Sequence, residues 1–113
     1  YAKNASSNFP RYLVMAKAQK DPEGFEQRLL HKLVDFKDKH VLEVGSGEGR
    51  LTFKYGAAAK RVIGFDPDHD ALRIARVDAP LDMQKHVHFA NASASNIPFS
   101  KETFDIAILA WSL

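Results

Sequence analysis

The sequence of 113 residues contains no cysteine. Disulfide bonds and thiolate metal sites are therefore excluded from it, and we expect a reducing, cytoplasmic location. The net charge is only +2, with scattered basic residues, so nucleic acid is not indicated as a partner. No segment approaches the roughly 20 consecutive apolar residues that a membrane-spanning helix needs, so we expect no membrane partner.

The chain has the length of one small domain. Hydrophobic residues make up 45% of it and charged residues 27%, which is typical of globular proteins. The polar residues at its start show no signal-peptide pattern. The sequence stops within the apolar segment 104–113, so we expect a piece of a longer protein.

Apolar strand-like segments alternate with helical ones. The pattern predicts helices over 11–19, 21–36, 50–59 and 67–79, and strands over 40–44, 61–65, 86–90 and 103–110. Alternating, almost continuously apolar strands favour a mostly parallel sheet with helices on both faces. We therefore predict an α/β fold of three layers, α/β/α.

The helices are expected to be amphipathic. In the helix over 21–36, the apolar face is predicted to include Leu29 and Leu33. In the helix over 67–79, we expect Leu72, Ala75 and Val77 to point toward the sheet.

The most informative stretch is 41–49, VLEVGSGEG, where an apolar strand ends in a turn with glycines at 45, 47 and 49. Glycine adopts positive φ and lets a ligand approach bare backbone. Asp66 ends the next strand, Ser93 and Ala94 follow the third, and Trp111 lies near the end of the fourth. Carboxyl ends of parallel strands form the ligand-binding rim, so these segments should converge. Glycines that only make a tight turn are the alternative.

Two carboxylates in this stretch restrict the ligand. The third glycine comes one residue earlier than in the dinucleotide pattern G-x-G-x-x-G. Glu43 and Glu48 would repel a pyrophosphate by on the order of a few kcal/mol, whereas they suit a ligand with ammonium and sulfonium groups. Alternatively, Arg50 pairs with Glu43 and Glu48 is simply exposed to solvent.

Asp66 is placed to accept hydrogen bonds from two ribose hydroxyls. Its alternative role is to cap the helix that begins at Pro67.

Four segments, 41–49, 62–68, 89–99 and 104–107, resemble in order the motifs of class I S-adenosylmethionine-dependent methyltransferases of the small-molecule type. The resemblance covers 38–113 and implies a Rossmann-like fold that is the N-terminal part of a seven-stranded sheet. It divides the chain into an N-terminal helical segment, 1–37, and an S-adenosylmethionine-binding region, 38–113.

The resemblance also implies a role for individual residues. Glu43 would hold the amino group of the cofactor directly or through water, and Asp66 would bind the ribose. Ser93 stands where the family usually has an aspartate that binds adenine, so adenine recognition would be weaker or shifted to the backbone N–H of Ala94. The implied cofactor-binding residues are Glu43, Gly45, Ser46, Gly47, Asp66, Pro67, Ser93 and Ala94.

The expected activity is transfer of a methyl group to a small-molecule acceptor, with no catalytic residue assigned. A non-catalytic cofactor-binding module and an NAD(P)-binding Rossmann domain remain as alternatives. His86 and His88 make only a weak metal pattern, and we expect no metal. Four strands alone would expose an apolar sheet edge, so we also expect a homodimer that covers that edge, unless the chain is truncated.

Overall fold

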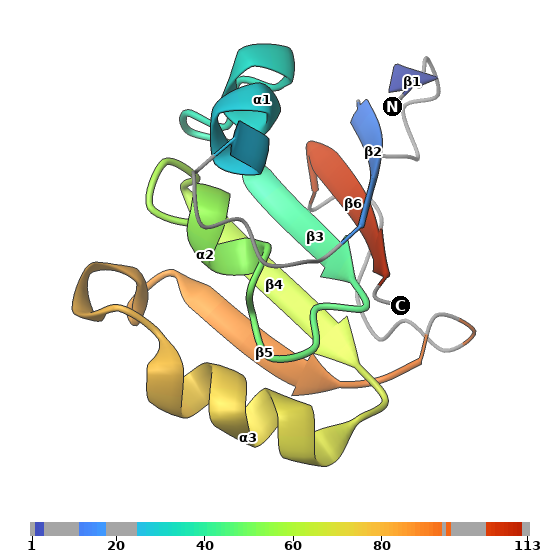
Figure 1. Cartoon of the computed structure of the whole chain (residues 1–113), viewed down its shortest axis with the longest axis vertical. Coiled ribbons are helices and arrows are strands. Elements are labelled where there is room, and N and C mark those ends of the chain that lie inside the picture. Colours follow the sequence, from blue (N-terminus) through green and yellow to red (C-terminus); the bar gives the residue numbers. More distant parts are fainter. Residues whose placement is uncertain (1, 4–11, 18–24, 94, 96–103, 112–113) are drawn as a thin grey trace.

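The computed structural model describes residues 2–3, 12–17, 25–93, 95 and 104–111 (Figure 1). They form a mixed α/β structure around one sheet. Its elements are β1 Ala2–Lys3, β2 Tyr12–Lys17, α1 Phe25–Leu33, β3 His40–Val44, α2 Thr52–Tyr55, β4 Arg61–Asp66, α3 His69–Asp78, the 3-10 helix η1 Leu81–Met83, β5 Val87–Asn91 and β6 Ile106–Trp111.

The strands lie in the order β1-β2-β6-β3-β4-β5. Strands β6, β3, β4 and β5 are parallel neighbours, β2 is parallel to β6, and β1 runs antiparallel to β2. The four strands predicted over 40–44, 61–65, 86–90 and 103–110 are thus confirmed, with shifts of a few residues at their ends. The prediction of an α/β fold with a mostly parallel sheet is confirmed with them.

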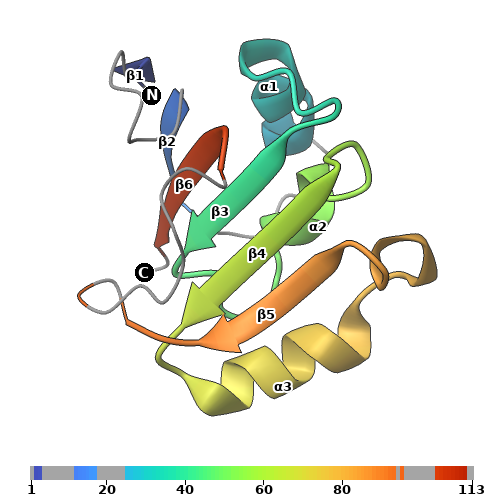
Figure 2. The same cartoon turned by 180° about the vertical axis from the view of Figure 1, so that it is seen from behind.

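The described helices all pack on one face of the sheet. Each supplies buried side chains to a single apolar cluster, including Leu30 of α1, Tyr55 of α2 and Leu72 of α3. A second cluster on the opposite face contains Leu42 and Ile63 but no residue of these helices. Figure 2 shows β3, β4 and β5 from that side with no helix in front of them. The described residues therefore form two of the three predicted layers.

The helix predicted over 11–19 is wrong, because Tyr12–Lys17 forms strand β2. A short apolar run fits either state, and here pairing with the distant β6 decides. Strand β2 also pairs with β6, so the four predicted strands do not leave that edge open. A homodimer across a sheet edge stays a prediction, and it would have to use β5 or β1. The division at residue 37 also stays a prediction, although β2 shares the sheet of the second segment.

Two predicted helix faces are corrected. Helix α1 leaves Leu29 and Leu33 exposed. The neighbouring Leu30 is buried in their place. In α3, Leu72 and Ala75 are buried as predicted, but Val77 is 81% exposed because five residues carry it about 140° around the helix from Leu72.

Helix α2 is shorter than the predicted 50–59. It ends at Tyr55, with Gly56 as its C-cap. The chain then turns so that Ala59 can form a bridge with Lys37, just before β4 begins. The long-range bridge ends the helix early.

Candidate functional site

The turn after β3 is fixed by the carboxyl end of β4. The backbone N–H groups of Gly45 and Ser46 both donate to the carbonyl oxygen of Phe65, at 2.8 and 3.1 Å. The N–H of Gly47 donates to Oδ2 of Asp66 at 3.0 Å. The two segments that the sequence suggested as neighbours on one rim are therefore in direct contact.

Asp66 does not cap the following helix. Asp68 is the N-cap of α3, and its side chain accepts a hydrogen bond from the N–H of Ala71 at 3.1 Å. Oδ1 of Asp66 instead accepts from the N–H of Asp68 at 2.8 Å. Each carboxylate oxygen can accept a further hydrogen bond, so the half-buried Asp66 can still receive donors from a ligand.

Positions 45 and 47 of the turn require glycine for different structural reasons. Gly45 has φ +81°, and a Cβ atom there would lie 2.6 Å from the carbonyl oxygen of Ala110. Glycine is therefore required at position 45 by packing against β6. This agrees with the alternative in which a glycine serves the turn and not a ligand. Gly47 has φ +55°, and a Cβ atom there would meet nothing within 4 Å. Its backbone faces open space, as a ligand-contacting glycine should.

Ser46 points away from that open space. Its side chain is buried, and Oγ has no hydrogen-bond partner in the described structure. A Cβ atom added to Gly64 of β4 would lie 2.8 Å from the Cβ of Ser46, so the absence of a side chain at Gly64 leaves room for the serine. The side chain of Ser46 therefore packs the turn onto β4.

Glu43 is fully buried beneath the turn. Its Oε1 accepts hydrogen bonds from the hydroxyls of Tyr55 at 2.6 Å and Thr52 at 2.9 Å, both from α2. Arg50, the partner we considered, is exposed. Oε2 of Glu43 is buried and has no partner in the described structure. A buried carboxylate with one oxygen unpaired is costly and favours a nearby cation.

Burial raises the pKa of Glu43 to about 7. The hydrogen bonds from Tyr55 and Thr52 lower it, and the negative charge of Asp66 raises it further. Burial likewise raises the pKa of Tyr55 well above its ordinary value, with Glu43 adding to the effect. Tyr55 therefore stays a neutral donor, while Glu43 can gain or lose its proton near neutral pH.

The sequence analysis missed Asn91. Its side-chain amide donates to the carbonyl oxygens of Asp66 and Pro67, each at 3.1 Å. The N–H of Ala92 also donates to the carbonyl oxygen of Asp66, at 3.2 Å. The end of β5 thus holds the Asp66–Pro67 turn, and a polar residue at a strand terminus was the available signal. Thr52 and Tyr55 were also missed, because they lie outside the glycine turn.

The remaining candidates lie in the glycine turn and near the ends of β5 and β6. Ser93 is half-buried and its Oγ lies 3.0 Å from Oγ of Ser95, whereas Ala94 lies outside the described residues. Glu48 is exposed, which agrees with the alternative that this side chain simply faces solvent. Trp111 is the last residue of β6.

The histidines offer no metal centre. Nε2 of His86 lies 2.8 Å from the carbonyl oxygen of Gly56, and His88 is exposed. Within the described part of the chain, no group of three or more His, Cys, Asp or Glu side chains could hold a metal ion. No helix among the described residues has both the length and the apolar character to cross a bilayer.

Comparison with known proteins identifies the class. Residues 41–113 match the methyltransferase domain family, so the chain belongs to that family. The cofactor of the family is S-adenosylmethionine.

Individual relatives agree with this assignment. The chain is 27% identical over 85 residues to an uncharacterized methyltransferase, YcgJ, of Bacillus subtilis strain 168, covering 74% of this chain and 34% of that protein. It is 24% identical over 97 residues to a demethylmenaquinone methyltransferase of Lactococcus lactis, covering 83% of this chain and 38% of that protein. A putative methyltransferase structure from Bacillus halodurans superposes with a TM-score of 0.66 at 26% identity, covering 74% of this chain and 37% of that one. The chain thus spans little more than a third of these relatives.

Proposed function

We propose that this chain is the S-adenosylmethionine-binding part of an enzyme that transfers a methyl group to a small-molecule acceptor. The observation that carries the proposal is the contact between Gly47 and Asp66. The backbone of Gly47 faces open space, and its N–H donates a hydrogen bond to the carboxylate of Asp66. The oxygens of that carboxylate can accept further hydrogen bonds from a ligand. A nucleoside with an attached amino acid needs both features.

The charges around the turn suit such a ligand. Glu43 lies beneath the turn with one unpaired oxygen, and its negative charge would stabilise an ammonium or sulfonium group. Because that oxygen is buried, Glu43 would act through its field or through an intervening group. Pro67 would lie against the adenine, and Ser93 or the backbone of Ala94 would meet its amino group. Gly45 and Ser46 would support the turn from behind.

When bound, the cofactor would supply an electrophilic methyl group on its sulfonium sulfur: the acceptor would bond to the methyl carbon as the carbon–sulfur bond breaks, with S-adenosylhomocysteine as the leaving group. The chain's own residues hold and orient the ligand at the rim of the sheet. The small-molecule acceptor is favoured by the demethylmenaquinone methyltransferase among the relatives. A general base is required only if the acceptor must lose a proton, and we assign none.

Calorimetric titration with S-adenosylhomocysteine tests the site. Asp66→Asn should weaken binding by about tenfold or more, because a charged acceptor for the ribose hydroxyls is lost. Asp68→Asn is the matched control: it removes the same charge two residues away, at the N-cap of α3, and Asn caps helices as well as Asp does. Equal losses in the two variants would contradict a specific role for Asp66.

The same measurement separates the alternatives. Binding of NAD without binding of the thioether would exclude the methyltransferase site and favour a dinucleotide-binding domain. Binding of the thioether without methyl transfer by the full-length protein, over a panel of small acceptors, would favour the non-catalytic module.

A further inference from the structure

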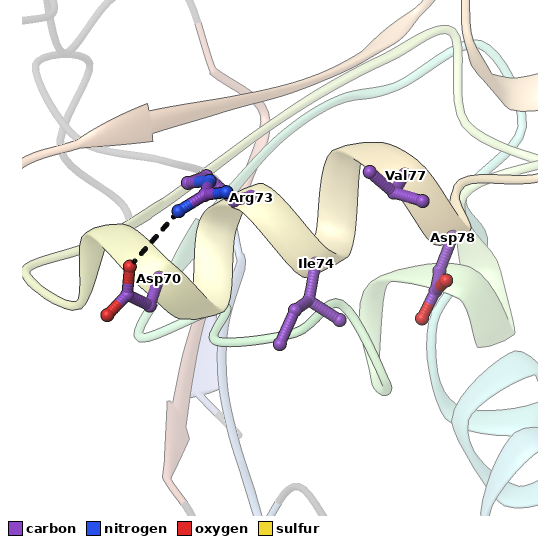
Figure 3. Close-up of a pocket in the computed structure, with 5 residues that line it drawn as sticks. All are labelled: Asp70, Arg73, Ile74, Val77 and Asp78. Carbon is purple, nitrogen blue, oxygen red and sulfur yellow. Dashed lines mark ion pairs between the residues drawn. The ribbon is translucent and has the colours of Figure 1, made fainter.

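The two hydroxyl groups that hold Glu43 come from one side of α2. Thr52 and Tyr55 are three residues apart, which places their side chains next to each other on a helix. Both are buried, and both donate to Oε1 of Glu43, at 2.9 and 2.6 Å. The outer side of α3 differs, because Figure 3 shows Arg73 and Asp70 paired there in solvent. The two hydroxyls of α2 therefore serve the interior of the protein.

The hydroxyl pair fixes the orientation of the carboxyl group. A carboxylate oxygen has two lone pairs, so Oε1 of Glu43 is saturated by the two donors. Rotation of the carboxyl group would break both hydrogen bonds at once. Oε2 has no partner in the described structure. It is therefore the oxygen left to act on a ligand, through its field or through an intervening group.

Helix α2 is attached directly to the glycine turn. The N–H of Phe53 donates to the carbonyl oxygen of Gly49 at 2.9 Å, and the N–H of Gly49 donates to that of Ser46 at 3.0 Å. Gly49 has φ +87°, and a Cβ atom there would lie 2.7 Å from the ring of Phe53. The absence of a side chain at Gly49 thus lets α2 begin against the turn. The hydroxyl pair consequently has a fixed position relative to the backbone of Gly47.

We propose that Thr52 and Tyr55 are positioning residues of the cofactor site: their hydroxyl groups hold Glu43 by one oxygen and keep it negatively charged for a cationic group of the ligand. They act through Glu43. The inference rests on the proposed function, because it requires a cationic ligand at the glycine turn.

The surroundings of Glu43 make these hydroxyls decisive for its charge. Burial raises its pKa to about 7 and Asp66 raises it further, whereas the two hydrogen bonds from α2 lower it. The neighbours of Glu43 in the sheet are Gly64 of β4 and Ile108 of β6, which do not titrate. From α1, the ring of His31 lies 2.9 Å from a carbonyl oxygen of α2. Loss of either hydroxyl should therefore favour the protonated carboxyl group.

NMR titration of the carboxyl ¹³C signal of Glu43 tests the effect on its charge. Thr52→Val and Tyr55→Phe each remove one hydroxyl with little change of shape, and each should move the titration to higher pH. Thr52→Ser keeps a hydroxyl and should titrate like the wild type. Arg73→Gln is the control, because it breaks only the exposed 3.6 Å contact with Asp70 on α3 (Figure 3). An unchanged titration in both hydroxyl variants would overturn the proposal.

Calorimetry with S-adenosylhomocysteine tests the effect on binding. Thr52→Val and Tyr55→Phe should each weaken binding about tenfold near pH 6.5 and much less near pH 8.5, where Glu43 is ionised in every variant. Equal losses at both pH values would indicate general damage to the turn and overturn the proposal. Urea unfolding verifies that the variants fold.

The same titrations distinguish this proposal from the proposed function. Wild-type protein that does not bind S-adenosylhomocysteine would refute the proposed function itself. Wild-type protein that binds, with hydroxyl variants that match its affinity at both pH values, would overturn only the positioning role.

Discussion

The hydroxyl of Tyr55 donates a 2.6 Å hydrogen bond to Oε1 of Glu43, and both side chains are fully buried. The ring of Tyr55 stacks on Phe36, with centroids 4.6 Å apart and planes 18° apart. The segment after α1 thus holds the tyrosine, and the tyrosine holds the carboxyl group beneath the glycine turn.

Tyr55→Phe should destabilise the protein by about 1–2 kcal/mol at pH 8, because a hydrogen bond to an ionised carboxylate is lost while the stacked ring is kept. The cost should be smaller at pH 5, where Glu43 is protonated. Urea unfolding at the two pH values measures both. The same loss at each pH would show that the hydroxyl does not act through the charge of Glu43.

Glu43→Gln should flatten the dependence of stability on pH. In the folded state the pKa of Glu43 is raised from 4.5 to about 7, so its protonated form is favoured there. The wild-type free energy of unfolding should therefore fall as pH rises from about 4.5 to 7, by on the order of 3 kcal/mol from this group, and level off above that. Denaturant unfolding across this range checks it. An unchanged slope in the variant would assign the pH dependence to other groups.

The affinity for S-adenosylhomocysteine should depend on the charge of Glu43. A cationic ligand group favours the ionised carboxylate, and below its pKa of about 7 the proton must first be released. Affinity should then fall by up to about tenfold for each pH unit below 7. Calorimetry between pH 5.5 and 8 tests this, with Glu43→Gln expected to bind more weakly and without the pH dependence. If the affinities of the wild type and of Glu43→Gln changed with pH in the same way, the role proposed for Glu43 would be contradicted.

Alanine at the two glycines should separate folding from binding. Gly45→Ala would place its Cβ 2.6 Å from the carbonyl oxygen of Ala110, so unfolding measurements should show a large loss of stability. Gly47→Ala has free space and should cost only about 1 kcal/mol, from its positive φ. It should nevertheless bind S-adenosylhomocysteine clearly more weakly, because the methyl group enters the ligand space. Full affinity in Gly47→Ala would mean that no ligand lies over this backbone.

The sequence by itself determined the four parallel strands and the glycine turn. Strands β3 and β4 are short, mainly apolar segments that alternate with helical ones, and Asp66 ends β4 at the spacing that brings it to Gly47. These features are local, or they follow from the shared edge of a parallel sheet.

Tertiary structure decided what local pattern could not. Strand β2 exists through its pairing with β6, against a helical prediction. Two glycines that look alike in the sequence differ because one meets a neighbouring strand and the other meets open space. Glu43 finds its partners on α2, and its pKa depends on burial that only the packed helix and sheet provide. Side-chain burial and long-range strand pairing depend on contacts between distant segments. The hydrophobic periodicity of a single segment contains no information about those contacts.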